Sequence, residues 1–359
     1  MKYSNQENKL AEKIKAAIPD VTPGVMVRAY QMGRLVCDVS VGNTHPFYDL
    51  ASLTKVIFTQ QALMVAYDQG RWNLKNKVVD FLPDFKVKDD PQNISSEILM
   101  TELLTHTSGL EWWKPFYQSM ELEKTWWQKR PLIYDMIKDS KLEKTGKAVY
   151  SDLGFILLGF ILENIYQKSI LDIWKDLKEK FYPSTTLDFH IENTTELPIN
   201  QFAPTEDCPW RKKVLRGQVH DENCYSFGGI STHAGLFGSI EDVSYYGLNV
   251  RSQLQGIARY GIRQKTAQTF ATRAIPSTVG DWALGYMMPS VESASCGPHF
   301  SVLSIGHTGF TGTSFWYDPR SDLLVLVLSN RVHYGRENKA YIQLRPQIHT
   351  WVYESLKRI

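Results

Sequence analysis

The strand-like segments of this chain lie at its two ends, and a long helical stretch separates them. Near the start, two alternating runs at 25–30 and 35–41 flank the turn-like Met32-Gly33-Arg34 and predict a β-hairpin. Strand-like runs return only after Gly235, at 282–287, 300–305, 313–317 and 323–329. We therefore predict one antiparallel sheet to which both ends of the chain contribute.

Helical patterns surround and interrupt these strands. They occur at 6–17, 53–67, 97–105, 119–139, 152–166, 169–181, 240–258 and about 337–357. The predicted fold class is α+β, with the sheet flanked by the terminal helices and a mainly helical lobe inserted. We expect residues 1–74 and 233–359 to form the sheet lobe and residues 75–232 the helical lobe. Because ligand sites favour the boundary between such lobes, the active site is expected in the cleft between them.

Charge and hydropathy exclude several classes of partner. The 359 residues include 40 Lys and Arg against 38 Asp and Glu, a formal charge of +2 that offers no general field for nucleic acid or an anionic membrane. The richest uncharged apolar run, Leu153 to Leu162, is shorter than the roughly 18 residues of a membrane helix. It indicates a buried core helix instead.

The cysteines bear on the compartment. Four of them stand far apart without a CxxC pair, at positions 37, 208, 224 and 296, which favours free thiols in a reducing compartment. Cys224 is expected to be a small buried hydrophobic residue rather than a nucleophile. The first residues contain no apolar segment of the kind found in secretory signals. We expect a cytoplasmic protein, or a periplasmic one if an upstream segment has been removed.

The motif Ser52-Leu53-Thr54-Lys55 places a hydroxyl and an amine three residues apart, on one face of a helix. A serine hydroxyl becomes a good nucleophile when a neighbouring base takes its proton. The backbone N–H of Ser52, at the start of the helix, is a candidate donor to an oxyanion. Alone, the motif is a weak signal, and a helix cap followed by an exposed lysine would be the more common interpretation.

Two further motifs follow in the chain. Tyr150-Ser151-Asp152 precedes the apolar helix, and His307-Thr308-Gly309 lies on a late predicted strand. With these motifs in this order, the chain resembles the serine β-lactamase and penicillin-binding-protein superfamily, in particular the branch of AmpC-type β-lactamases and β-lactamase-fold esterases. The resemblance spans about 23–351, and its supporting segments are 103–110, 203–206, 217–223, 233–237 and 330–333.

The resemblance implies a two-step acyl transfer without a metal or other cofactor. Ser52 would be the acylated nucleophile, Lys55 and Tyr150 would share the proton transfers, and the N–H groups of Ser52 and Phe310 would hold the oxyanion. Asp152, His307, Thr308 and Gly309 would line the substrate site. The expected substrates are small esters or amides, including β-lactams and a cell-wall-derived peptide or muramyl amide. The alternative is a penicillin-receptor-like binding or sensing domain that is acylated with little turnover.

Two residues depart from the common pattern. His307 stands where many relatives have Lys and is mostly uncharged at neutral pH, so we expect weaker affinity for substrate carboxylates. Asp152 stands where AmpC-type enzymes have Asn, and a carboxylate there raises the pKa of Lys55. We therefore expect Tyr150 to take more of the base role, with Lys55 held as a cation.

Two other groups of residues have alternative interpretations. His220 and His233 lie near Asp221 and Glu222, but they lack the spacing of a metal site, which favours structural hydrogen bonds. The tryptophans at 112, 113, 126 and 127 either form a wall of an acyl pocket or fill the core of the helical lobe, and those at 112 and 113 are the better candidates for the wall because they follow the loop at 108–109.

Overall fold

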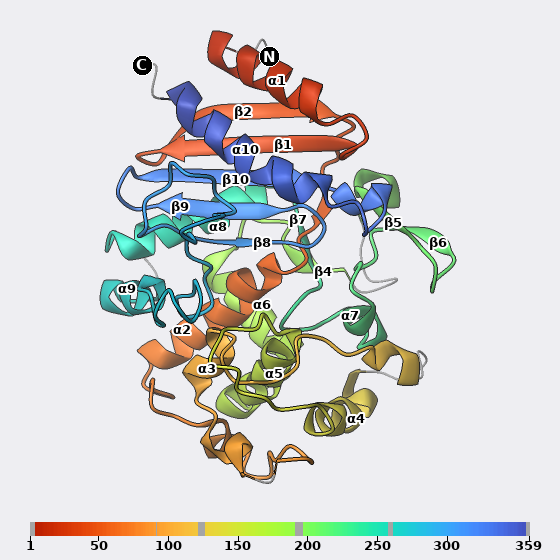
Figure 1. The fold of residues 1–359 in the computed structure, drawn as a ribbon, viewed down its shortest axis with the longest axis vertical. Helices are drawn as coiled ribbons and strands as arrows, with labels where there is room; N and C mark the ends of the chain where they lie inside the picture. Colours follow the sequence, from red (N-terminus) through yellow and green to blue (C-terminus); the bar gives the residue numbers. More distant parts are fainter. Residues whose placement is uncertain (1–3, 91, 121–125, 191–196, 258–260, 357–359) are drawn as a thin grey trace.

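A five-stranded antiparallel sheet joins the two ends of the chain in the computed structural model, which describes residues 4–90, 92–120, 126–190, 197–257 and 261–356 (Figure 1). Its order is β2-β1-β10-β9-β8. The strands are β1 (Gly24–Gln31), β2 (Arg34–Gly42), β8 (Ile305–Thr308), β9 (Ser314–Asp318) and β10 (Leu323–Ser329). This arrangement confirms the predicted sheet.

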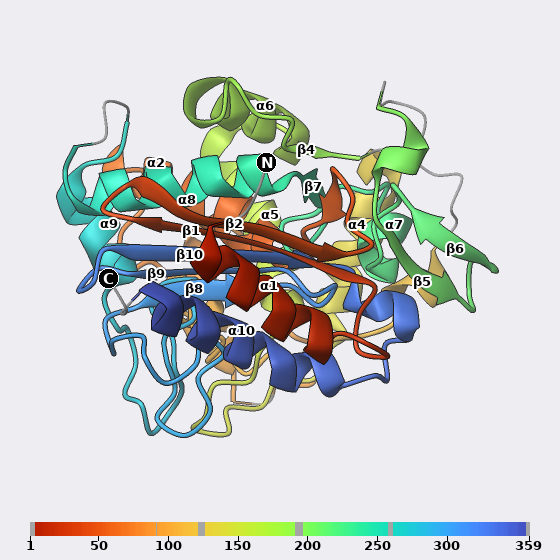
Figure 2. The same cartoon turned by 90° about the horizontal axis from the view of Figure 1, so that it is seen from above.

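Helices cover both faces of the sheet (Figure 2). Val325 and its alternate neighbours face α1 (Asn5–Ala17) and α10 (Ala340–Leu356), and together they form one apolar cluster. Leu324 and its alternate neighbours belong to the larger cluster on the other face, beneath α8 (Ile240–Leu254). Because side chains alternate along a strand, a strand such as β10, which is apolar from Leu323 to Leu328, can support both layers.

The helical part of the chain packs around α5 (Asp152–Tyr166), whose residues 153–163 are all buried. This confirms the predicted core helix. The other elements there are η1 (Lys55–Gln60), α2 (Gln61–Asp68), α3 (Met100–Leu104), α4 (Trp126–Lys138), α6 (Ile170–Phe181), and 3-10 turns at Val78–Asp80, Ile94–Glu97 and Phe116–Ser119. Of the helix predicted at 119–139, residues 121–125 lie outside the described residues.

Two predicted strands are wrong or much shorter than expected. In 282–287, Gly285 has a φ of +91°, and the Ala283 N–H donates to the Tyr286 carbonyl, so the run folds into a turn. Only Met287 reaches the sheet edge, through two hydrogen bonds with Gly306 in β8. The run 300–305 forms a turn before β8 and contributes only its last residue to that strand.

Several short elements were not predicted. A small sheet has the order β3-β7-β4, with β3 at Tyr48–Asp49, β7 at Leu236–Gly238 and β4 at Asp188–Phe189. The remaining elements are the hairpin β5 (Pro204–Cys208) and β6 (Lys213–Arg216), α7 (Glu222–Ser226), α9 (Gln264–Ala271), and 3-10 turns at Ile199–Gln201 and Arg331–Tyr334. Strands of two to five residues have too few side chains to show a period. The lobe boundaries at 75 and 232 stay a prediction.

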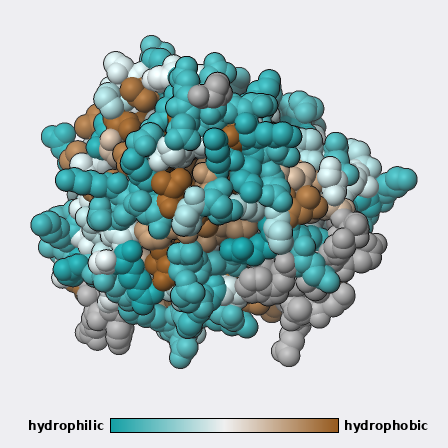
Figure 3. Space-filling view, turned by 90° about the horizontal axis from the view of Figure 1, so that it is seen from below, coloured by the Kyte–Doolittle hydropathy of each residue, from teal (hydrophilic) through white to brown (hydrophobic). Residues whose placement is uncertain are grey.

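The surface and the thiols agree with a globular chain. No helix within the described ranges is long and apolar enough to cross a bilayer. Seen from below, apolar residues form small patches among hydrophilic ones (Figure 3). All four cysteines are unpaired, as predicted, and all four are buried, as predicted for Cys224. Burial raises the pKa of the Cys224 thiol well above its usual range.

Candidate active site

A strained turn presents Ser52 at the start of its helix. Ala51, the residue before it, has a left-handed φ of +47°, a conformation that non-glycine residues rarely adopt. The buried carboxylate of Asp49 holds this turn, because it accepts hydrogen bonds from the Ala51 N–H at 2.8 Å and the His220 N–H at 2.6 Å. Sequence analysis did not identify Asp49, which lies in no motif that we recognised.

The Lys55 ammonium lies directly beside the serine hydroxyl. Its Nζ is 3.0 Å from Ser52 Oγ, 2.6 Å from Asp152 Oδ1 and 3.1 Å from the His233 carbonyl oxygen. The side chain is fully buried, so the alternative of an exposed lysine is wrong. Burial lowers the pKa of Lys55, but Asp152 and Tyr150 outweigh it and raise the pKa above its ordinary value. Lys55 is therefore a cation with all three hydrogens bonded.

The aromatic ring of Tyr150 packs against the Lys55 ammonium. Lys55 Nζ lies 5.0 Å from the centroid of the Tyr150 ring. Burial raises the pKa of the Tyr150 phenol, and the positive charge of Lys55 opposes that rise. The next two residues begin α5: the Ser151 hydroxyl caps the helix by accepting the Gly154 N–H at 3.1 Å, and Asp152 follows at the first helical position. The cap thus fixes where Asp152 meets Lys55.

His106 supports the tyrosine motif, a role that sequence analysis missed. Its Nδ1 accepts the Ser151 N–H at 3.0 Å, and its ring centroid lies 4.6 Å from that of Tyr150. His106 has a φ of +58° and is buried. It lies within the segment 103–110 that supported the family resemblance, so the signal was present without a role attached to it.

His307 reaches the site as a neutral acceptor. It is 1% exposed, and its Nδ1 lies 2.9 Å from the Thr308 carbonyl oxygen. Since a carbonyl only accepts, Nδ1 carries the hydrogen and Nε2 is the bare nitrogen. Nε2 has no hydrogen-bond partner among the described residues. Burial, together with the charge of Lys55, lowers the pKa of His307 to about 3, so the predicted uncharged imidazole is confirmed.

The turn after β8 is fastened to the segment that carries the serine. The Thr311 hydroxyl donates to the Asp49 carbonyl at 2.7 Å, and the Thr313 hydroxyl donates to the Leu50 carbonyl at 3.1 Å. A Cβ atom at Gly309 would lie 2.8 Å from the Leu50 carbonyl oxygen, so only glycine fits this approach. The last residue of the His-Thr-Gly motif thus packs directly beside the nucleophile segment.

Two backbone donors become available at this junction. Within the described part of the chain, neither the Ser52 N–H nor the Phe310 N–H donates a hydrogen bond to another residue. Phe310 follows Gly309 at the first central position of the turn closed by the bond from the Gly312 N–H to the Gly309 carbonyl. The structure therefore leaves free the two N–H groups that the resemblance assigns to an oxyanion site. Thr308 ends β8 with its hydroxyl 3.8 Å from the Met287 sulfur.

The two histidines of the central loops make hydrogen bonds to carboxylates, as predicted. His220 Nε2 lies 3.0 Å from Glu206, and His233 Nε2 lies 3.0 Å from Asp221. The carbonyl of His233 also accepts a bond from Lys55. In the ranges that the structure describes, no three metal-ligating side chains come together.

Trp112 lies beside the site, and neither Trp112 nor Trp113 is buried in the core. Trp112 is 62% exposed, and its carbonyl accepts the Asp152 N–H at 2.9 Å. Its ring centroid is 5.8 Å from that of Trp113, which in turn contacts Tyr117. This exposure excludes the alternative that Trp112 fills the core of the helical lobe. It favours the alternative that Trp112 forms part of a pocket wall next to Asp152.

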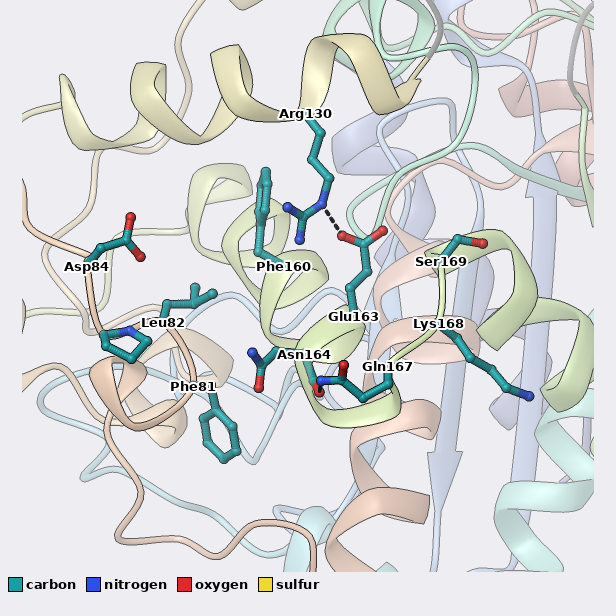
Figure 4. A pocket seen from close by; sticks show the side chains of 11 residues that line it. Phe81, Leu82, Asp84, Arg130, Phe160, Glu163, Asn164, Gln167, Lys168 and Ser169 are labelled. Atoms are coloured by element: carbon teal, nitrogen blue, oxygen red, sulfur yellow. Dashed lines mark hydrogen bonds and ion pairs between the residues drawn. The ribbon is translucent and has the colours of Figure 1, made fainter.

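A separate cavity of about 490 Å³ lies between α4, α5 and the loop at 81–84 (Figure 4). Arg130 lies over the Phe160 ring there and forms an ion pair with Glu163. The two opposite charges therefore satisfy each other. None of the predicted site residues lines this cavity.

A family model described as Beta-lactamase matches residues 12–347. The chain belongs to the beta-lactamase family. It is 31% identical to the N-acetylmuramyl-L-alanine amidase of Bacillus subtilis (strain 168), over 90% of this chain and 81% of that protein. Membership in the beta-lactamase family makes the chain a serine hydrolase, as the resemblance implied.

Solved structures of the same fold include enzymes of different specificity. EstCE1, a hydrolase with promiscuous acyltransferase activity, superposes with a TM-score of 0.71 at 18% identity, covering 97% of this chain and 98% of its own. A class C beta lactamase from Rhodobacter sphaeroides gives 0.66 at 18% identity, covering 97% and 99%. At such identities the match shows the fold alone. It confirms the predicted α+β beta-lactamase-family architecture.

Proposed function

We propose that this protein cleaves small esters or amides through a covalent acyl-enzyme on Ser52. The observation that carries the proposal is the buried Lys55 ammonium, which bonds both Ser52 Oγ at 3.0 Å and Asp152 at 2.6 Å. A buried lysine is costly unless its charge is paired and hydrogen-bonded, and here one of its partners is a reactive hydroxyl. This contact supports a prepared nucleophile.

In the proposed acylation, Ser52 Oγ attacks the substrate carbonyl carbon and its proton passes to the deprotonated Tyr150 oxygen. The Lys55 cation stabilises that phenolate, because opposite charge favours the ionised form. The N–H groups of Ser52 and Phe310 hold the oxyanion while the bond to the leaving alcohol or amine breaks. Tyr150 returns the proton to the leaving group, and water then hydrolyses the acyl-enzyme.

The proposed substrate lacks a carboxylate next to the scissile bond. His307 is neutral and its only free ring nitrogen is an acceptor, so it provides no cation for a carboxylate. The relationship to a muramyl-alanine amidase makes a muramyl amide or cell-wall-derived peptide the first amide to test. Exposed Trp112 beside Asp152 offers an aromatic face for the acyl side.

Intact-mass measurement after reaction with a fluorophosphonate tests the nucleophile. We expect one adduct on the wild-type protein and none on Ser52→Ala, and a strongly slowed reaction in Tyr150→Phe. An adduct that persists in Ser52→Ala would refute the assignment. Turnover of p-nitrophenyl butyrate, nitrocefin, a D-Ala-D-Ala peptide and a muramyl-peptide, measured side by side, identifies the substrate class.

One observation favours a second function, a penicillin-receptor-like domain that is acylated with little turnover. All three hydrogens of the Lys55 ammonium are bonded within the protein, which leaves Tyr150 as the only member of the Lys55–Tyr150 pair that can deprotonate the water needed for deacylation. A stoichiometric acyl-enzyme that persists for hours, without steady release of nitrophenol, would favour this function. Steady turnover favours the hydrolase.

A further inference from the structure

Arg345 is a buried cation that has no counter-ion among the described residues. It lies on α10, is 8% exposed, and makes no ion pair with any described residue. Its Nε has no hydrogen-bond partner in the part of the chain that the structure describes, while its Nη1 is shared between the carbonyl oxygens of Gly309 and Thr313, each at 3.4 Å. Burying an unpaired charge costs free energy, so its position calls for a compensating role.

The carbonyl that Arg345 contacts belongs to a particular peptide group. The Gly309 C=O and the Phe310 N–H are the two polar ends of one planar unit. The carbonyl end accepts from the Gly312 N–H at 3.1 Å and from Arg345, whereas the N–H end has no acceptor among the described residues. A cation beside the Gly309 carbonyl oxygen draws electron density from the peptide group toward that oxygen. The Phe310 N–H thereby becomes a stronger hydrogen-bond donor.

We propose that Arg345 is a positioning residue that orients and polarises the Gly309–Phe310 peptide so that its N–H stabilises the oxyanion. This inference rests on the proposed acyl transfer at Ser52. Behind the turn, a fixed positive charge acts on the negative charge that develops in the transition state, without any contact with substrate. The buried site keeps that charge from being screened by water.

Arg331 provides the matched control. It is also buried, and its Nε donates to the Phe310 carbonyl at 2.7 Å, which belongs to the following peptide group. Its guanidinium also lies 4.6 Å from the centre of the Phe310 ring. Removing Arg331 therefore disturbs the same turn and the same core without removing the charge from the Gly309 carbonyl.

The test is a double-mutant cycle on the rate of acylation by p-nitrophenyl butyrate. Arg345→Met is expected to slow acylation roughly tenfold with little change in KM, because the charge acts on the transition state. In a Phe310→Pro background, which lacks the N–H, Arg345→Met should change the rate less than twofold. Arg331→Met should have the same effect in the Phe310→Ala and Phe310→Pro backgrounds, because both lack the ring that Arg331 contacts and they differ only in the N–H.

The possible outcomes distinguish a failure of the role proposed for Arg345 from a failure of the proposed function. Equal effects of Arg345→Met in both backgrounds would overturn the role of Arg345 and leave the proposed function intact. A Phe310→Pro variant as fast as Phe310→Ala would instead refute the oxyanion site itself. If Arg345→Met does not fold, as judged by circular dichroism, Arg345→Lys carries the same cycle. Lysine keeps the positive charge, so Arg345→Lys should slow acylation less than threefold. A larger decrease in the acylation rate that is also seen in the Phe310→Pro background would contradict the inference.

Discussion

Deleting one backbone hydrogen tests the proposed oxyanion site most directly. Phe310 occupies the first central position of the turn between Gly309 and Gly312, the position where proline is favoured in common turns. The preceding residue is glycine, which tolerates the restriction that proline imposes on its neighbour. Phe310→Pro should therefore keep the turn and remove only the N–H and the ring.

The ring needs its own control, because it contacts two neighbours. It stacks on His220 with centroids 5.6 Å apart and lies 4.6 Å from the Arg331 guanidinium. Phe310→Ala loses the same contacts but keeps the N–H. Since the site offers two donors, from Ser52 and Phe310, removing one should slow acylation by about 10²- to 10³-fold, or roughly 2.7–4 kcal/mol, relative to Phe310→Ala.

Single-turnover acylation with p-nitrophenyl butyrate, followed by nitrophenol absorbance, measures this ratio. Thermal unfolding of both variants checks that the turn is kept, and we expect their melting temperatures to agree within about 3 °C. A ratio below threefold between the two variants, with unfolding unchanged, would refute the proposed role of the Phe310 N–H.

Three further predictions concern charge and burial. Because the pKa of Tyr150 is raised and its deprotonated form is the proposed base, kcat/KM should rise from pH 6 to 9. Asp152→Asn should shift this rise to lower pH, because it removes a carboxylate that raises the pKa of Tyr150. A kcat/KM that does not change with pH would contradict the proposal. His307→Lys should increase nitrocefin hydrolysis relative to ester hydrolysis, because it places a cation where the neutral imidazole lies, and an unchanged ratio would show that His307 does not set the preference. Burial lowers the pKa of His349 to about 3, so the unfolded chain binds a proton that the folded chain does not between pH 6.5 and 3. The free energy of unfolding should therefore fall as the pH falls through this window, by up to about 1.4 kcal/mol per pH unit for this histidine. His349→Gln should reduce that slope in urea titrations, and an identical slope would contradict the assignment.

The long periodic elements were predictable because each carries its own signal. Strand β10 is apolar from Leu323 to Leu328 and helix α5 from Leu153 to Leu162, and the structure places both stretches in the core. The run 282–287 carried a similar apolar signal but turns at Gly285. The left-handed conformation of Gly285 turns the chain there, and the residue types alone do not show its φ.

The sequence by itself determined which residue types meet in the site: a serine and lysine on one helix, a tyrosine motif before a core helix, and a His-Thr-Gly strand, in a fixed order. Through the family resemblance, it also predicted that a carboxylate at Asp152 would raise the pKa of Lys55, since a nearby opposite charge favours the charged form.

Only the tertiary structure decided the state of each group. Spacing along the chain cannot show that Lys55 is fully buried with three acceptors, or that the free nitrogen of His307 is an acceptor. The supporting residues Asp49, His106 and Arg345 come from three distant parts of the chain. Their roles arise from burial and from contacts with backbone carbonyl and N–H groups, which leave no pattern in the sequence because every residue has them.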